Sequence, residues 1–142
     1  MFEQGGKAYV YLIYGMYSCF NITTGEEGVP EAVLIRAAQP IDGIETMMRL
    51  RQGKRQIKSL SEKTLLAGPG RLCSGMAISR ADCGVSMTGE DIFICEGISV
   101  PQERIASTKR INIDYSEEAR DFLYRFVDTK SDCLSVKWKE KR

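Results

Sequence analysis

The chain has 142 residues, a length typical of one domain, and a formal net charge of +1 from 20 basic and 19 acidic residues. Its 43% hydrophobic and 27% charged residues are ordinary for a globular domain and exclude a disordered or collagen-like chain. No apolar run approaches the ~20 residues of a membrane span, and the first residues lack a secretory-signal pattern, so we expect a cytoplasmic protein with no membrane partner.

The first third of the sequence predicts three strands. Residues 8–14 and 17–23 are rich in β-branched and aromatic side chains, and they flank a glycine, so we expect a β-hairpin. Residues 31–37 form a third apolar run. In this hairpin Tyr9 and Tyr11 share one face of the strand because side chains alternate.

Helical segments are expected next. Asp42 is a candidate N-cap for a helix whose apolar face includes Ile44, Met47 and Met48. Residues 61–66 predict a short helical turn, and a Gly-Pro-Gly break precedes a helix over 71–78.

The last third predicts short strands and one further helix. The strands are expected over 92–95, 110–113 and 123–127, and a helix-start signal lies at 116–120. Because hairpin-like strands and helices are intermixed, the sequence favours an α+β fold on a largely antiparallel sheet.

The sequence contains no histidine, which excludes Ser-His-Asp triads, Cys-His dyads and HExxH zinc sites within this chain. Its five cysteines form no CxxC pair, so neither a zinc site nor a disulfide framework is expected. We interpret them as small buried residues of a reducing compartment; a cysteine nucleophile stays open but has no local support. We expect no metal and no cofactor.

Basic residues concentrate in one segment. Residues 46–63 carry six basic side chains against one acidic one, a net charge of +5. Such a segment can neutralise several phosphates, and the alternative is a solvated helix end and loop. Gly68-Pro69-Gly70-Arg71, which follows it, offers free backbone N–H groups to a phosphate or forms a simple turn.

Tyrosines crowd the predicted hairpin, and Tyr14 falls where the chain turns. They either pack in the sheet or form a stacking platform and a wedge for nucleic acid, because aromatic side chains stack on bases and wedges unstack base steps. Asn21 and Arg36 lie in apolar strands, where each needs a partner. A structural hydrogen bond or ion pair and a role in a binding pocket both remain open for them.

Taken together, these segments resemble the alkyladenine (3-methyladenine) DNA glycosylases. The resemblance covers about Phe2 to Val136 and is carried by six segments: Ala8-Tyr-Val-Tyr-Leu-Ile-Tyr-Gly-Met16, Cys19-Phe-Asn21, Val33-Leu-Ile-Arg-Ala37, Gly43-Ile-Glu-Thr-Met47, Gly68-Pro-Gly-Arg-Leu-Cys73 and Arg110-Ile-Asn-Ile-Asp-Tyr115. Tyr124-Arg-Phe126 also fits a late strand of the family.

The resemblance implies a base-excision-repair enzyme that hydrolyses the N-glycosidic bond of alkylated or deaminated purines in double-stranded DNA after base flipping. It implies an α+β domain with a curved antiparallel sheet and a protruding hairpin that enters the minor groove. Tyr14 corresponds to the intercalating residue at the tip, which it forms with Gly15 and Met16. Tyr11 corresponds to a residue that stacks on the flipped base. Asn21 corresponds to the pocket asparagine of the family, and Arg36 corresponds to the arginine that orients the hydrolytic water.

The same resemblance indicates a single partial domain over residues 1–142 that lacks the family's N-terminal segment. In the family that segment holds the water-activating glutamate of a Glu-Thr-Glu-Ala-Tyr-like motif, which has no counterpart here. Residues 129–133 stand where the family often has a Gly-Asn-Pro turn. The alternatives are a catalytically inactive DNA-binding fragment and a remnant whose tyrosines only pack. We expect a monomer, and a nucleoid-associated one if the protein is bacterial.

Overall fold

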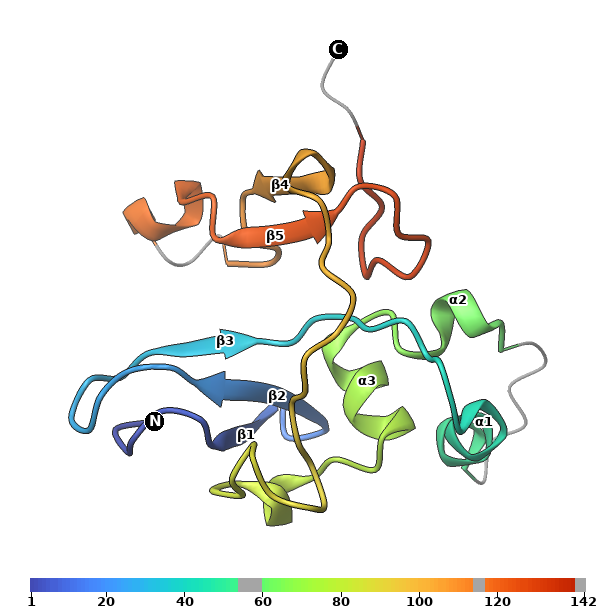
Figure 1. Ribbon diagram of the computed structural model, residues 1–142, viewed down its shortest axis with the longest axis horizontal. Coiled ribbons are helices and arrows are strands. Elements are labelled where there is room, and N and C mark those ends of the chain that lie inside the picture. The colour runs from blue at the N-terminus through green and yellow to red at the C-terminus, as the bar shows by residue number, and fades with distance from the viewer. Residues whose placement is uncertain (54–59, 114–116, 140–142) are drawn as a thin grey trace. The chain divides into compact units, whose positions relative to one another are not determined.

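The computed structural model describes residues 1–53, 60–113 and 117–139 (Figure 1). The chain divides into two compact units, residues 1–95 with 133–136, and residues 96–132 with 137–142. Helices and antiparallel sheets are mixed, so the predicted α+β fold is confirmed. The prediction of one partial domain over 1–142 stays a prediction. No helix of the described residues is long and apolar enough to cross a membrane.

The first unit is built on a three-stranded antiparallel sheet in the order β1-β2-β3. Strands β1 (Ala8–Ile13) and β2 (Tyr17–Thr23) form the predicted hairpin, with Ile13 opposite Tyr17 and Ala8 opposite Ile22. Strand β3 (Ala32–Leu34) is shorter than predicted, although the Ile35 N–H still donates to the Phe20 carbonyl at 3.0 Å.

Three helices accompany this sheet: α1 (Ile44–Gln52), α2 (Glu62–Leu65) and α3 (Pro69–Gly75). The N-cap of α1 is Gly43 with φ 67°, and not Asp42 as predicted, because the Asp42 carboxylate accepts only from the Gly43 N–H. Helix α3 begins two residues earlier and ends three residues earlier than predicted. Ala77, at φ 55°, has the left-handed backbone that stops a helix.

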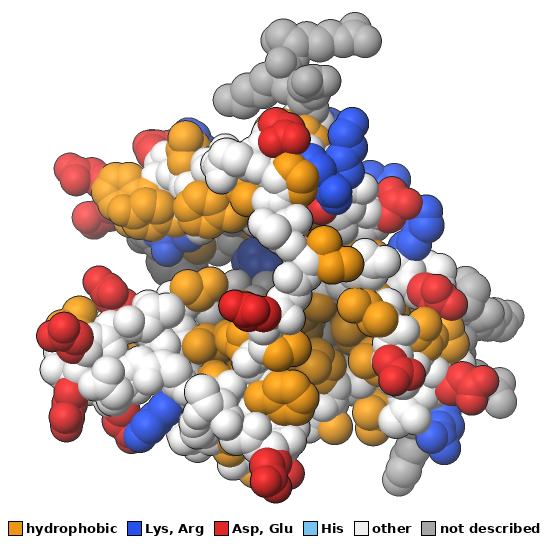
Figure 2. All heavy atoms as spheres, in the orientation of Figure 1, with side chains coloured by type: hydrophobic (Ala, Val, Ile, Leu, Met, Phe, Trp, Pro, Cys, Tyr) orange, Lys and Arg blue, Asp and Glu red, His pale blue; other side chains and the backbone are white. Residues whose placement is uncertain are grey.

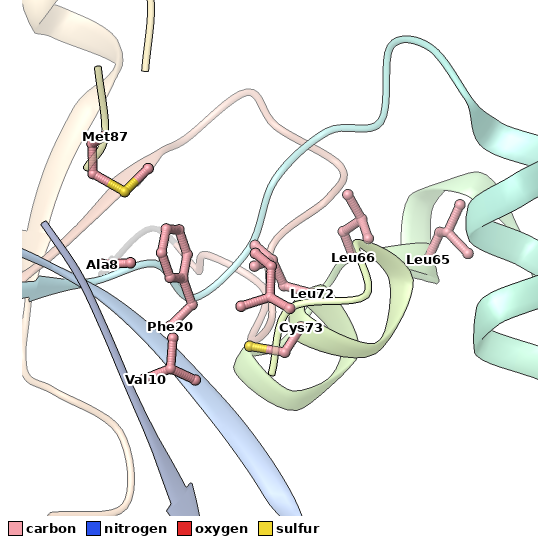
Figure 3. Packing of buried hydrophobic residues seen from close by; sticks show 9 residues of the cluster. Ala8, Val10, Phe20, Leu65, Leu66, Leu72, Cys73 and Met87 are labelled. Carbon is pink, nitrogen blue, oxygen red and sulfur yellow. The ribbon is translucent and has the colours of Figure 1, made fainter. Parts of the chain in front are cut away.

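The core of this unit lies between the hairpin and helices α2 and α3 (Figure 3). Ile44, Met47 and Met48 pack against it from α1, as their spacing predicted. Its buried members are Ala8, Val10, Phe20, Leu65, Leu66, Leu72, Cys73, Ile78 and Met87.

The predictions of strands at 92–95 and 110–113 are wrong. The first segment forms only an isolated bridge between Thr88 and Phe93, and both Phe93 and Ile94 are exposed. In the second, Asn112 has φ 56°, which interrupts an extended backbone. An apolar run forms a strand only where a second strand pairs with it.

The second unit contains an antiparallel pair, β4 (Ile105–Thr108) and β5 (Arg125–Asp128). Three short 3-10 helices, η1 (Arg80–Asp82) in the first unit and η2 (Gln102–Arg104) and η3 (Glu117–Asp121) in the second, complete the described elements. Arg104 donates from two nitrogens to the Asp128 carboxylate, which lowers the pKa of Asp128. Figure 2 shows hydrophobic side chains gathered over β5 and η3; the exposed ones are Phe122, Leu123, Tyr124 and Phe126.

The five cysteines are free, and three of them are buried. Cys19, Cys73 and Cys133 are buried as predicted, but Cys83 and Cys95 are exposed.

We expect the pH dependence of stability to report the burial of Cys73. Burial raises the pKa of this thiol from 9.0 to about 11. As the pH rises past the pKa of the unfolded thiol, the unfolded chain loses this proton while the folded chain keeps it. The unfolding free energy should therefore fall by up to about 2.7 kcal/mol between pH 9 and pH 11. Denaturant unfolding of wild type and Cys73→Ala checks this, and equal slopes in that window would contradict it.

Candidate nucleic-acid interface

The hairpin turn holds Tyr14 in an unusual backbone conformation. Tyr14 has φ 51° and Gly15 has φ 68°, and the Met16 N–H closes the turn on the Ile13 carbonyl at 3.1 Å. Positive φ at both central residues is the pattern of a type I′ turn, which favours asparagine or glycine at the position that Tyr14 occupies. Left-handed backbone costs a non-glycine residue about 1–2 kcal/mol. A bulky aromatic residue is thus kept at this tip against a local cost.

The tip is apolar and exposed. Tyr14 is 84% exposed and Met16 is 72% exposed, while Ile13 and Tyr17 beside them are partly exposed. Large exposed apolar patches often mark sites where a protein binds a partner or ligand. The structure therefore places a projecting apolar tip where the sequence predicted a wedge.

Tyr11 and Asn21 lie on one face of the hairpin. Tyr11 pairs across the strands with Cys19, and Tyr9 pairs with Asn21. The Tyr9 and Tyr11 rings are in contact, with centroids 5.6 Å apart. Since strands rise about 3.3 Å per residue, Asn21 lies roughly 13 Å along β2 from Tyr17. The tip and the Asn21 position are separate parts of one surface.

Asn21 is buried and oriented by the backbone. Its Nδ2 donates to the carbonyls of Tyr9 at 3.1 Å and Cys19 at 3.2 Å. These two hydrogen bonds are the structural role for Asn21 that the sequence analysis left open beside a role in a binding pocket. Because the amide nitrogen is used in this way, the carbonyl oxygen is the group that Asn21 can still offer to a ligand.

Cys19 connects the other predicted site residues. Burial raises the pKa of its thiol, and a hydrogen bond with Tyr11 and the charge of Arg36 act in the opposite direction. Its carbonyl accepts from Asn21. Tyr11, Asn21 and Arg36 thus converge on one buried residue. Sequence reasoning missed this role, although the Tyr11–Cys19 strand pairing could have indicated it.

Arg36 lies two residues beyond the end of β3 and is half-buried. The register of β3 against β2 pairs Leu34 with Asn21, so Arg36 follows the segment that adjoins the hairpin. The Arg36 charge also acts on the pKa of Cys19, in agreement with this register.

Two arginines of different helices form a second positive feature. Arg51 of α1 donates to the Leu65 carbonyl at 3.2 Å, and Arg71 of α3 donates to the Ala67 carbonyl at 3.5 Å. Burial lowers the pKa of Arg51, and the charge of Arg71 lowers it further. The charges of these two side chains therefore act on one another, which the sequence did not predict.

The basic segment is only partly described, since Lys54, Arg55 and Lys58 lie outside the described residues. Over the described residues, no group of three or more histidine, cysteine, aspartate or glutamate side chains is arranged to hold a metal ion.

The amino-acid sequence of the chain is similar to that of a known protein family. The sequence model of the methylpurine-DNA glycosylase (MPG) family matches residues 1–132. The chain belongs to this family of DNA glycosylases, so the resemblance is confirmed.

Curated relatives agree with the family match. The chain is 51% identical over 140 residues to a protein of Alkaliphilus oremlandii named "Putative 3-methyladenine DNA glycosylase", covering 96% of this chain and 68% of that protein. A protein of the same name from Clostridium acetobutylicum is 43% identical over 96% of this chain and 67% of its own length. A protein of the same name from Bacillus cereus strain G9842 is 46% identical over 89% of this chain and 63% of its own length.

Proposed function

We propose that this chain recognises an alkylated or deaminated purine in duplex DNA by inserting the Tyr14 tip into the minor groove and flipping the damaged nucleotide. The exposed, locally strained Tyr14 carries this proposal. A strained aromatic residue that packs on little of its own protein is poorly explained by stability alone. An apolar side chain inserted between base steps is a known means of unstacking them.

The flipped base would occupy the hairpin face that carries Tyr11 and Asn21. A purine ring stacked on an aromatic side chain gains about 1–3 kcal/mol. The Asn21 carbonyl oxygen would accept a hydrogen bond from a donor on the purine edge. A damaged base leaves its stack at lower cost than a normal one, which contributes to selectivity.

The reaction we propose is hydrolysis of the N-glycosidic bond. A water oxygen forms a new bond to C1′ of the sugar, the bond from C1′ to the purine nitrogen breaks, and its electron pair leaves with the base. The proton that the water loses passes to solvent when the leaving base is cationic and to the base when it is uncharged, and the products are a free purine and an abasic site. Arg36 would orient that water beside the Tyr11 face, because the strand register places Leu34 opposite Asn21 and Arg36 two residues further along the chain.

A second candidate, for these 142 residues taken by themselves, is lesion binding without base release. The family resemblance assigns proton removal to the glutamate of a Glu-Thr-Glu-Ala-Tyr-like motif, and these 142 residues contain no such motif. A missing general base typically costs 10²–10⁴-fold in rate.

Single-turnover release of base from a duplex with one hypoxanthine or alkylated adenine separates the two candidates. Release above a blank without protein supports the hydrolase. Binding of the damaged duplex without release supports the second candidate, and neither binding nor release contradicts both.

The Arg51–Arg71 pair is expected to contact the DNA backbone. Arg71→Ala should weaken binding to damaged and undamaged duplex alike and reduce the slope of log K against log salt by about 0.9, the value for one phosphate contact. Titrations at several salt concentrations measure this. Arg80→Ala, an exposed arginine of η1, is the matched control and should leave the slope unchanged.

A further inference from the structure

Helix α3 contacts the β1–β2 hairpin through one glycine, Gly70. An ideally placed Cβ atom at Gly70 would lie 3.1 Å from Cδ1 and 3.2 Å from Cβ of Tyr17. Both distances are shorter than ordinary carbon–carbon contacts. The backbone of α3 therefore approaches Tyr17 more closely than most residues with a side chain do.

Two ordinary reasons for a glycine do not apply at this position. Gly70 lies inside α3, where alanine is a better helix former. Gly70 is also absent from the glycines with positive φ, so its backbone conformation is open to other residues. The close approach to Tyr17 is a structural reason for glycine at this position.

A second glycine of α3 provides a comparison. A Cβ at Gly75 would lie 2.5 Å from Cδ2 of Leu66, which is 2% exposed, so that glycine serves the core. Tyr17, in contrast, is 54% exposed and pairs with Ile13 at the end of the hairpin. The contact between Gly70 and Tyr17 adds little to the core. It joins α3 to the hairpin at a residue next to the turn.

We propose that Gly70 is a positioning residue, which lets α3 hold Tyr17 and thereby fixes the direction in which the Tyr14 tip projects. The inference rests on the proposed function for its consequence, because a hairpin that inserts into DNA must be aimed before binding. A rigid tip loses less conformational entropy on binding than a mobile one. Gly70 acts through Tyr17 and has no role in the bond-breaking step.

Gly70→Ala tests this inference against Gly97→Ala. Gly97 is the matched control, because no atom lies within 4 Å of its ideal Cβ and its φ is not positive. Gly70→Ala should raise the Kd for a duplex with one damaged purine by about tenfold, as expected when a packed contact is overfilled. Gly97→Ala should leave that Kd unchanged.

Amide hydrogen exchange supplies a readout that does not depend on DNA. The Met16 N–H, which closes the turn on Ile13, should exchange faster in Gly70→Ala, while amides of β4 and β5 should not change. Tyr17→Ala removes the ring from the other side of the contact and should also speed Met16 exchange. This second variant decides the question if Gly70→Ala does not fold.

The outcomes separate the two proposals. If wild type does not bind the damaged duplex, the proposed function fails and Met16 exchange alone decides the role of Gly70. The inference would be overturned if the Met16 amide exchanged at the wild-type rate in both Gly70→Ala and Tyr17→Ala. Unchanged affinity of Gly70→Ala for a damaged duplex that wild type binds would also overturn it.

Discussion

Replacing Tyr14 with glycine is expected to weaken binding to damaged DNA while leaving the fold as stable as wild type or more stable. Glycine adopts the φ of 51° without the steric cost that tyrosine bears, so the unfolding free energy should rise by up to about 1 kcal/mol. Loss of the ring removes about 1–3 kcal/mol of stacking, which raises Kd by roughly 5–150-fold. Denaturant unfolding and a binding titration, made on the same preparation, measure the two effects.

The opposite signs of these effects separate function from packing. Tyr14→Phe keeps the ring and should bind damaged DNA nearly as well as wild type. If Tyr14 only packed within its own chain, Tyr14→Gly would lower stability and leave DNA affinity unchanged, and that result would reject the wedge.

Arg36→Ala is the second large expected effect, and it concerns rate. If Arg36 orients the water, its loss should slow single-turnover base release by about 10²-fold, the cost of a misplaced reactant. The Kd for damaged duplex should change little, because the tip and the Asn21 face are unaltered. Rates at saturating protein, combined with titrations, separate the two quantities.

Arg36→Lys is the control for charge, since lysine keeps the positive charge without the planar guanidinium. A rate between those of wild type and Arg36→Ala supports water orientation. Equal losses of affinity and rate in both variants would instead indicate that Arg36 holds the fold or the DNA, and thermal unfolding distinguishes these.

The sequence predicted the hairpin well because its signal is local. The apolar and aromatic character of residues 8–14 and 17–23 specifies two strands, and the Gly15 turn requires that they pair. The strands predicted at 92–95 and 110–113 failed because a strand also needs a pairing partner, and partner choice is set by the whole fold.

The roles of the candidate site residues stay predictions, and the contacts among them could not be predicted from the sequence. The family resemblance named Tyr11, Tyr14, Asn21 and Arg36. The position of Cys19 beside Tyr11, Asn21 and Arg36 and the effect of the Arg71 charge on Arg51 depend on different segments of the chain. The contact of Gly70 with Tyr17 also joins distant segments, and a glycine carries no side-chain signal that would predict it.

The most direct test of this account compares the Kd values of the wild-type chain for two duplexes that differ only in one base, hypoxanthine or 1,N6-ethenoadenine against adenine. Both candidate functions require lesion recognition, so this comparison does not depend on catalysis. The account predicts tighter binding of the damaged duplex by at least about tenfold, because the damaged base leaves its stack more cheaply. Equal affinity for the two duplexes would contradict it.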